Sequence, residues 1–386
     1  MLWKLLRSAF RPRPSVDSLV NRGLAFRKEG RLRDAEQVLR EAVAAFPRDA
    51  AALTDLAIVV LEQGRAENGA VLLQRALECE PRFAPAHYNL ANLARASGRR
   101  DLALDHYQAA VDCDPDFAPA REELMHCLLE TCDWDRAENQ ANALHAVIAR
   151  LPAAEWMRRV SPLTASYLQL APALCKEVAA YHAAGYASGV QPVAKNSAAG
   201  DEPARLRIAY LSPDFRDHAV GHLLGNALSL HDRARFEVFA FSYGADDGSA
   251  YRAAIASAVD CFVDGRDRTD AELAADISRA GIQVLIDLAG HTTGNRLAVL
   301  ARRPAPVQVH YLGYPATTGA KYIDYFITDH VATPPALAAD FSEHLAYLPH
   351  CFMASDGADA ARAGVAERAA EGLSADAVVF CNFNNA

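Results

Sequence analysis

Residues 206–229 read LRIAYLSPDFRDHAVGHLLGNALS, and this stretch decides the fold of the second half of the chain. It opens with a short, β-rich apolar run at residues 206–211, which Pro213 ends. A polar turn at residues 214–218 leads into a segment whose apolar residues recur with helical spacing. The pattern predicts a strand, a sharp loop and a helix.

The turn of this unit is a candidate site, because ligands of open parallel α/β sheets bind beyond the carboxyl ends of the strands. The polar residues that carry this expectation are Asp214, Arg216, Asp217, His218 and His222. The alternative is a solvated loop with two surface histidines.

Strand-like runs alternate with helical patterns from here onward, which predicts a Rossmann-like, doubly wound parallel sheet with right-handed crossovers. The strand-like runs are residues 206–211, 236–243, 284–288, 307–312 and 322–328. The helical patterns are residues 222–230, 249–258, 269–280 and 295–302.

The first part of the chain repeats itself every 34 residues, as the spacing of Pro47, Pro81 and Pro115 shows. Glycines, small residues and alanines keep the same interval, at Gly30, Gly64 and Gly98, at Gly23, Ala57 and Ala91, and at Ala42, Ala76 and Ala110. This period is typical of tetratricopeptide repeats, helix pairs that stack into an α-solenoid. A solenoid presents a groove, so we expect it to hold peptides or partner proteins. The alternative is a spacer, or a dimerisation arm that would make the protein a homo-oligomer.

Composition describes a soluble globular protein with two or three domains. The chain has 386 residues, of which 51% are hydrophobic and 23% charged, and a net charge of −9. This acidic balance argues against a broad surface for nucleic acid. The eight cysteines form no C-x-x-C pair, which favours reduced thiols in a cytoplasmic protein over disulfides or a zinc site. Lys4 and Arg7 interrupt the apolar run at the start, so we expect neither a signal peptide nor a membrane span.

The repeat pattern weakens after Pro115, where Cys132 takes the position of the turn glycine. Residues 153–184 continue as helix, and residues 185–201 are rich in Gly, Ala, Ser and Pro, which predicts a domain boundary there. An apolar strand signal at residues 378–380 resembles the first strand of a further domain.

Two more loops at predicted strand ends resemble binding loops. Residues 289–296, AGHTTGNR, follow one strand, and residues 312–320, LGYPATTGA, follow the next. Their glycines and hydroxyl groups suit close approach of the backbone to a ligand. No dinucleotide, P-loop or nucleophile-elbow motif follows any strand, so those classes of enzyme lose their main support.

Long motifs now make the chain recognisable. They are LRIAYLSPDFRDH, DLAGHTTGNR, RRPAPVQVHYLGYPATTGA, YIDYFITDHVATPP and SEHLAYLPHCF. Together they resemble the O-linked N-acetylglucosamine transferase and SPINDLY-like family, which joins tetratricopeptide repeats to a two-lobed, metal-independent, inverting GT-B glycosyltransferase. FCNFNNA looks like the start of the second lobe of that family.

The resemblance implies roles for individual residues. His218 matches a histidine beside the sugar-transfer centre and is a candidate base, and Asp214 is its companion. Substrate-binding positions are implied at Leu312, Gly313, Tyr314, Pro315 and Arg296, and His222 is added from its place near the first strand end. His291 and Thr293 receive no firm role.

The resemblance also implies the activity, an inverting transfer of a sugar from a nucleotide sugar to Ser or Thr of proteins. UDP-N-acetylglucosamine is the expected donor and GDP-fucose the alternative. No metal and no other cofactor is expected, and neither nucleic acid nor membrane is an expected partner. A catalytically inactive scaffold that binds partner proteins is the alternative function, and in the family the leaving-group machinery belongs to the second lobe.

These expectations divide the chain into four parts. We predict a repeat solenoid at residues 16–150, a helical transition and linker at 151–200, an amino-terminal catalytic lobe at 201–372, and the start of a second lobe at 373–386.

Overall fold

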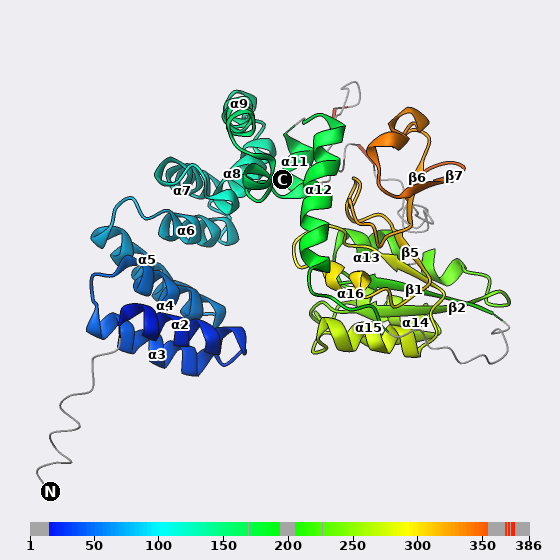
Figure 1. Ribbon diagram of the computed structural model, residues 1–386, viewed down its shortest axis with the longest axis horizontal. Coiled ribbons are helices and arrows are strands. Elements are labelled where there is room, and N and C mark those ends of the chain that lie inside the picture. Colours follow the sequence, from blue (N-terminus) through cyan, green and yellow to red (C-terminus); the bar gives the residue numbers. More distant parts are fainter. Residues whose placement is uncertain are drawn as a thin grey trace, which may run out of the picture. The chain divides into compact units, whose positions relative to one another are not determined.

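The computed structural model describes residues 15–353, except 169, 194–204 and 226, together with residues 367, 368, 370 and 372–374 (Figure 1). The chain divides after Pro152 into a helical-repeat unit and a sheet unit. The strand predicted at residues 378–380 lies outside the described residues.

The helical-repeat unit consists of antiparallel helix pairs, as the 34-residue period predicts (Figure 1). Its helices are α2 (Val16–Lys28), α3 (Leu32–Ala45), α4 (Ala50–Glu62), α5 (Ala66–Cys79), α6 (Ala84–Ala96), α7 (Arg100–Cys113), α8 (Ala118–Glu130) and α9 (Trp134–Arg150). The periodic small residues lie where helices cross. Ala42, Ala76 and Ala110 have no exposed surface, and a Cβ on Gly23 would lie 2.6 Å from Cγ of Leu39. The small side chains therefore let the helices of each repeat approach closely.

The turns inside the helix pairs explain the periodic glycines. Gly30, Gly64 and Gly98 have φ of 75°, 79° and 71°, a left-handed conformation that glycine adopts at little cost. Cys132 holds the equivalent turn of the fourth pair with φ of 55°. The last turn thus adopts the same geometry with a less suitable residue.

The sheet unit contains seven parallel strands in the order β3-β2-β1-β4-β5-β6-β7. They are β1 (Leu206–Ser212), β2 (Phe236–Ser242), β3 (Cys261–Asp264), β4 (Val284–Asp287), β5 (Val307–His310), β6 (Tyr325–Asp329) and β7 (His344–Leu348). The predicted doubly wound sheet is confirmed. The sequence pattern missed β3 and β7 because both are short edge strands whose side chains are mostly only half-buried or exposed.

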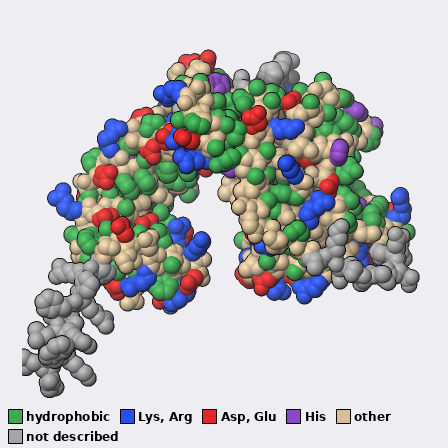
Figure 2. All heavy atoms as spheres, in the orientation of Figure 1, with side chains coloured by type: hydrophobic (Ala, Val, Ile, Leu, Met, Phe, Trp, Pro, Cys, Tyr) green, Lys and Arg blue, Asp and Glu red, His purple; other side chains and the backbone are tan. Residues whose placement is uncertain are grey.

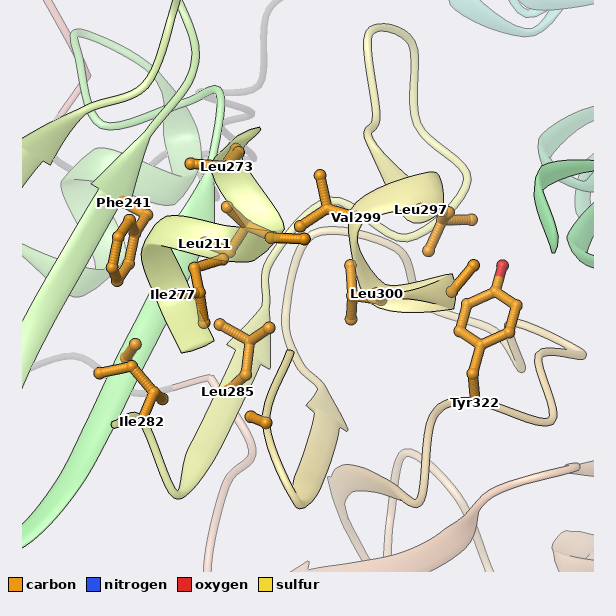
Figure 3. Close-up of a cluster of buried hydrophobic side chains, with 14 of the residues drawn as sticks. Leu211, Phe241, Leu273, Ile277, Ile282, Leu285, Leu297, Val299, Leu300 and Tyr322 are labelled. Carbon is orange, nitrogen blue, oxygen red and sulfur yellow. The ribbon is translucent and has the colours of Figure 1, made fainter. Parts of the chain in front are cut away.

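Helices cover both faces of this sheet. The helices of this unit are α10 (Ala153–Met157), α11 (Pro162–Tyr167), α12 (Pro172–Ala187), α13 (Ala219–Leu224), α14 (Ala250–Ser257), α15 (Asp270–Arg279) and α16 (Leu297–Ala301), with 3₁₀ turns at Ala227–Leu230 and Pro335–Asp340. On one face, Leu211 and Leu285 pack against α15 and α16 (Figure 3). On the other, Tyr210 and Ile286 pack with α13 and α14. Successive residues of a strand therefore point into two separate cores, because side chains alternate between the two faces of a sheet.

Residues 153–193 belong to the sheet unit, which places the division of the chain earlier than the predicted boundary at residues 185–201. Ala183 of α12 is buried in the core shared with α16, and the backbone N–H of Val193 donates to the carbonyl of Arg302 at 2.7 Å. Lys176 of α12 donates to the carbonyls of Ala339 and Phe341. These contacts make the helical transition a packed layer of the lobe.

Candidate functional site at the carboxyl ends of the strands

The three predicted loops follow neighbouring strands. β1, β4 and β5 are adjacent in the sheet, and Leu211, Asp287 and His310 lie opposite one another across them. Because parallel strands end at the same edge, residues 213–218, 288–296 and 311–320 emerge side by side. The site predicted from separate stretches of sequence therefore lies along one edge of the sheet.

Glycines allow the second and third loops to pack backbone against backbone. A Cβ on Gly313 would lie 1.8 Å from the carbonyl oxygen of Leu288, and one on Gly290 would lie 2.6 Å from Cβ of Tyr314. Gly290 also has φ of 55°. Any other residue at either position would push the loops apart.

His218 begins helix α13 as its N-cap. Its Nδ1 accepts the backbone N–H of Val220 at 3.3 Å and lies 3.8 Å from Oδ2 of Asp214. In the neutral imidazole, the proton is therefore on Nε2. The ring is 40% exposed, so Nε2 is the nitrogen that can meet a substrate.

Asp214 lies in the same turn and is much less exposed than His218. Its Oδ1 accepts from Arg216 at 3.2 Å, and its backbone N–H donates to the hydroxyl of Ser212. The predicted pair of His218 and Asp214 is thus close, but their 3.8 Å separation is longer than a hydrogen bond.

His222 lies one turn further along and has partners of its own. Its Nε2 donates to Oδ1 of Asp217 at 2.7 Å, and its ring lies 4.1 Å from that of Tyr251. The backbone N–H of Asp217 in turn donates to the carboxylate of Asp247. Hydrogen bonds from backbone N–H groups lower the pKa of Asp247 to about 2. The exposed side chains of His222, Asp217 and Tyr251 therefore lie together where the segments after β1 and β2 meet.

Arg296 makes its contacts with the neighbouring connection between β3 and α15. Its guanidinium donates to Oδ1 of Asp270 at 2.6 Å and to the carbonyls of Gly265 and Arg268. It also lies 5.7 Å from the centre of the Tyr243 ring and is only 16% exposed. These contacts favour a structural role, because they leave the guanidinium little capacity for a substrate.

The predicted binding residues of the third loop are of two kinds, one buried and the others at least partly exposed. The side chain of Tyr314 is buried and its hydroxyl donates to the carbonyl of Pro162, so it points away from solvent and cannot line a binding surface without moving. Pro315 is exposed, and Leu312 and Gly313 are partly exposed. Leu312 has φ of 73° and the N–H of Gly313 donates to the carbonyl of Tyr311, which is the strained form of a γ-turn.

Sequence reasoning missed a buried carboxylate that holds the end of this loop. Oε2 of Glu343 accepts the Thr317 hydroxyl at 2.6 Å and the Ser342 N–H at 3.1 Å, and Oε1 accepts the N–H and hydroxyl of Thr318. The only signal was an acidic residue near the start of β7, a strand that the pattern did not reveal.

The described part of the chain shows neither a metal cluster nor a membrane-spanning helix. Within it, no three His, Cys, Asp or Glu side chains lie together as a metal site would need. None of its helices has the length and apolar character to cross a membrane. Figure 2 shows basic and acidic side chains intermingled on the face in view.

The fold and the candidate site define a class of protein, namely repeat proteins whose second unit is a Rossmann-like lobe with its candidate binding loops at the carboxyl edge. The sequence pattern of "Glycosyl transferase family 41" matches residues 131–363, and tetratricopeptide patterns match residues 20–82 and 84–117. Since the first match spans more than half of the chain, the chain belongs to glycosyl transferase family 41.

Individual relatives agree with this membership. The chain is 34% identical over 242 residues to the "Probable UDP-N-acetylglucosamine--peptide N-acetylglucosaminyltransferase SEC" of Arabidopsis thaliana, covering 60% of this chain and 25% of that protein. It is 43% identical over 159 residues to the UDP-N-acetylglucosamine--peptide N-acetylglucosaminyltransferase of Caenorhabditis elegans, covering 41% and 14%. The chain thus spans about a quarter or less of the length of these curated relatives.

A solved structure shares the fold. A variant of the Thermobaculum terrenum O-GlcNAc transferase matches with a TM-score of 0.54 and 27% identity, over 88% of this chain and 58% of that one. The expected combination of tetratricopeptide repeats with the first lobe of a GT-B fold is therefore confirmed.

Proposed function

We propose that this chain supplies the repeats and the amino-terminal lobe of an inverting protein O-glycosyltransferase that moves N-acetylglucosamine from UDP-N-acetylglucosamine to Ser or Thr. Membership of glycosyl transferase family 41 carries this proposal, since the matched residues include β1 to β7 and all three loops of the site. The relatives from Arabidopsis thaliana and Caenorhabditis elegans are named for this reaction. The repeats would present the acceptor polypeptide.

His218 is the residue of this lobe that we propose to touch the reacting groups. The cap hydrogen bond to Nδ1 favours Nε2–H, which would donate to an oxygen of the sugar or of the acceptor. To accept the proton of the acceptor hydroxyl, Nε2 would first have to lose its own proton to Nδ1, which would break the cap. Such a cap contributes about 1 kcal/mol, which corresponds to less than a factor of ten in the equilibrium between the two forms of the neutral imidazole. His218 can therefore take the form that a base requires at little energetic cost.

Neutralising the leaving diphosphate requires cationic side chains or helix N-termini in an enzyme without a metal ion. Arg296 is paired with Asp270 and does not supply this charge in the structure. We therefore propose that residues outside this lobe bind the diphosphate.

The test uses labelled UDP-N-acetylglucosamine and GDP-fucose with acceptor peptides, and compares this chain with a longer protein that contains it and a second lobe. In the active form, His218→Asn should lower transfer by about 10² to 10⁴-fold, because it removes the imidazole. Asn is also a good N-cap, so stability should be unchanged. His344→Gln is the matched control, since that exposed histidine begins β7 at the opposite edge of the sheet. Full activity of His218→Asn would overturn the assignment of His218.

A scaffold that binds partner proteins without transferring sugar is the second candidate. It is favoured by the internal commitment of Arg296 and the burial of Tyr314, two residues that the sequence predicts to bind substrate. Absence of transfer from either donor by either protein, together with retained peptide binding by the repeats, would favour the scaffold.

A further inference from the structure

A buried histidine joins the second and third loops beneath the candidate site. His310 is the last residue of β5 and has no exposed surface, and Asp287, the last residue of β4, lies opposite it with 1% exposed. Nδ1 of His310 lies 3.2 Å from Oδ2 of Asp287, and Nε2 lies 2.8 Å from the carbonyl oxygen of Tyr314. The same Oδ2 accepts the N–H of Gly290 at 2.7 Å.

The partners of His310 indicate its charge. A carbonyl oxygen accepts only, and an ionised carboxylate accepts only, so each ring nitrogen needs a proton to bond its partner. His310 is then an imidazolium that donates in two directions, paired with a buried carboxylate. Burial by itself lowers the pKa of His310, but the hydrogen bond and the charge of Asp287, with the bond to Tyr314, outweigh burial and raise the pKa.

The other groups around His310 are compatible with one positive charge there. Glu343 adds a negative charge, which further raises the pKa of His310. Burial, with a smaller contribution from His310, lowers the pKa of His291 to about 4. Nε2 of His291 donates to the carbonyl of Thr318. His291 is therefore neutral near pH 7. Phe326 of β6 closes the remaining side, with its ring centre 5.4 Å away.

We propose that His310 is a positioning residue, whose imidazolium ties the Gly313–Pro315 turn to the loop after β4 and so holds the candidate binding edge in shape. The charged ring bridges Asp287 and the backbone of Tyr314, the residue at the centre of that turn. A neutral ring keeps one of these two donated bonds and releases the other. Its effect on sugar transfer rests on the proposed function, whereas its effect on the turn does not.

The direction of the pH dependence follows from the raised pKa. The stabilisation from His310 is fully present below the pKa of an unfolded histidine, about 6.5, and is lost as pH rises through the higher pKa of the folded state. The Gly313–Pro315 turn should therefore become less stable toward alkaline pH, while the sheet itself keeps its structure.

The first experiment is NMR of the whole chain with ¹⁵N-labelled histidine. The His310 signals, assigned by their loss in His310→Gln, should show two protonated ring nitrogens at pH 7. A singly protonated ring at pH 7 would overturn the proposal. If His310→Gln alone fails to fold, the double variant Asp287→Asn/His310→Gln serves for assignment, because it removes both buried charges together.

The second experiment is hydrogen exchange of the amides of residues 311–314 and 316 between pH 6 and 9, corrected for the intrinsic exchange rate. Protection in the natural chain should fall at least tenfold as His310 loses its proton. In the double variant it should not change with pH. An equal pH dependence in both proteins would contradict the proposal.

Where a transfer-competent protein is available, kcat/KM should show an alkaline limb that the double variant lacks, and His344→Gln should retain it. Persistence of that limb in the double variant would also count against the positioning role. If no form transfers sugar, the proposed function fails, while NMR and exchange still decide the role of His310.

Discussion

Replacing Arg296 by methionine should destabilise the sheet unit while leaving its shape near the site intact. The guanidinium makes a charge-assisted bond to Asp270 and bonds to the carbonyls of Gly265 and Arg268, and the side chain is 16% exposed. Removing one partner of a fully buried pair costs about 3 to 5 kcal/mol. Because the side chain of Asp270 is 37% exposed and regains water, we expect the low end, about 3 kcal/mol. For a unit of this size, that corresponds to a fall in Tm of about 6 to 12 °C.

The assay is thermal and urea unfolding followed by circular dichroism, combined with calorimetric titration of UDP-N-acetylglucosamine into the longer protein that contains this chain and a second lobe. Arg266→Met is the matched control, since Arg266 pairs only loosely with Asp267 at 4.0 Å and both are exposed. It should change stability by less than about 0.5 kcal/mol. The reasoning is refuted if Arg296→Met unfolds like the natural chain yet loses nucleotide-sugar binding, since Arg296 would then serve the substrate.

Two further predictions concern the repeats. Cys132→Gly should raise the free energy of unfolding by about 0.5 to 1 kcal/mol, because φ of 55° strains a non-glycine residue. Gly98→Ala, whose new Cβ would meet nothing within 4 Å, should lower the free energy of unfolding by a similar amount. Urea unfolding measures both changes, and a Cys132→Gly variant less stable than the natural chain would contradict this account. Burial raises the pKa of Asp55 from 3.8 to about 6, so the folded chain binds the proton of this carboxyl more tightly than the unfolded chain does. The free energy of unfolding should therefore fall by about 3 kcal/mol as the pH rises from about 4 to 6. Asp55→Asn should be more stable than the natural chain at pH 7 and lack this fall; an unchanged pH profile would show that Asp55 is not the cause.

The architecture was predictable because its signals are local. The 34-residue spacing of prolines, glycines and alanines predicts the helix pairs, and the apolar runs before Pro213 and at residues 284–288 predict central strands. The short edge strands β3 and β7 were not predictable in this way, because an edge strand buries little on either side. The predicted boundary at residues 185–201 followed composition, whereas contacts of α12 with the sheet place the division earlier.

The sequence by itself determined the repeat, the parallel sheet and the three loops that meet at its edge. Only the tertiary structure decided which side chains in those loops have free donors and acceptors. Arg296 finds Asp270, Tyr314 finds Pro162, and His310 finds Asp287. The physical reason is that periodicity records whether a residue faces a core or solvent, whereas hydrogen bonding and charge depend on partners that folding brings from distant parts of the chain.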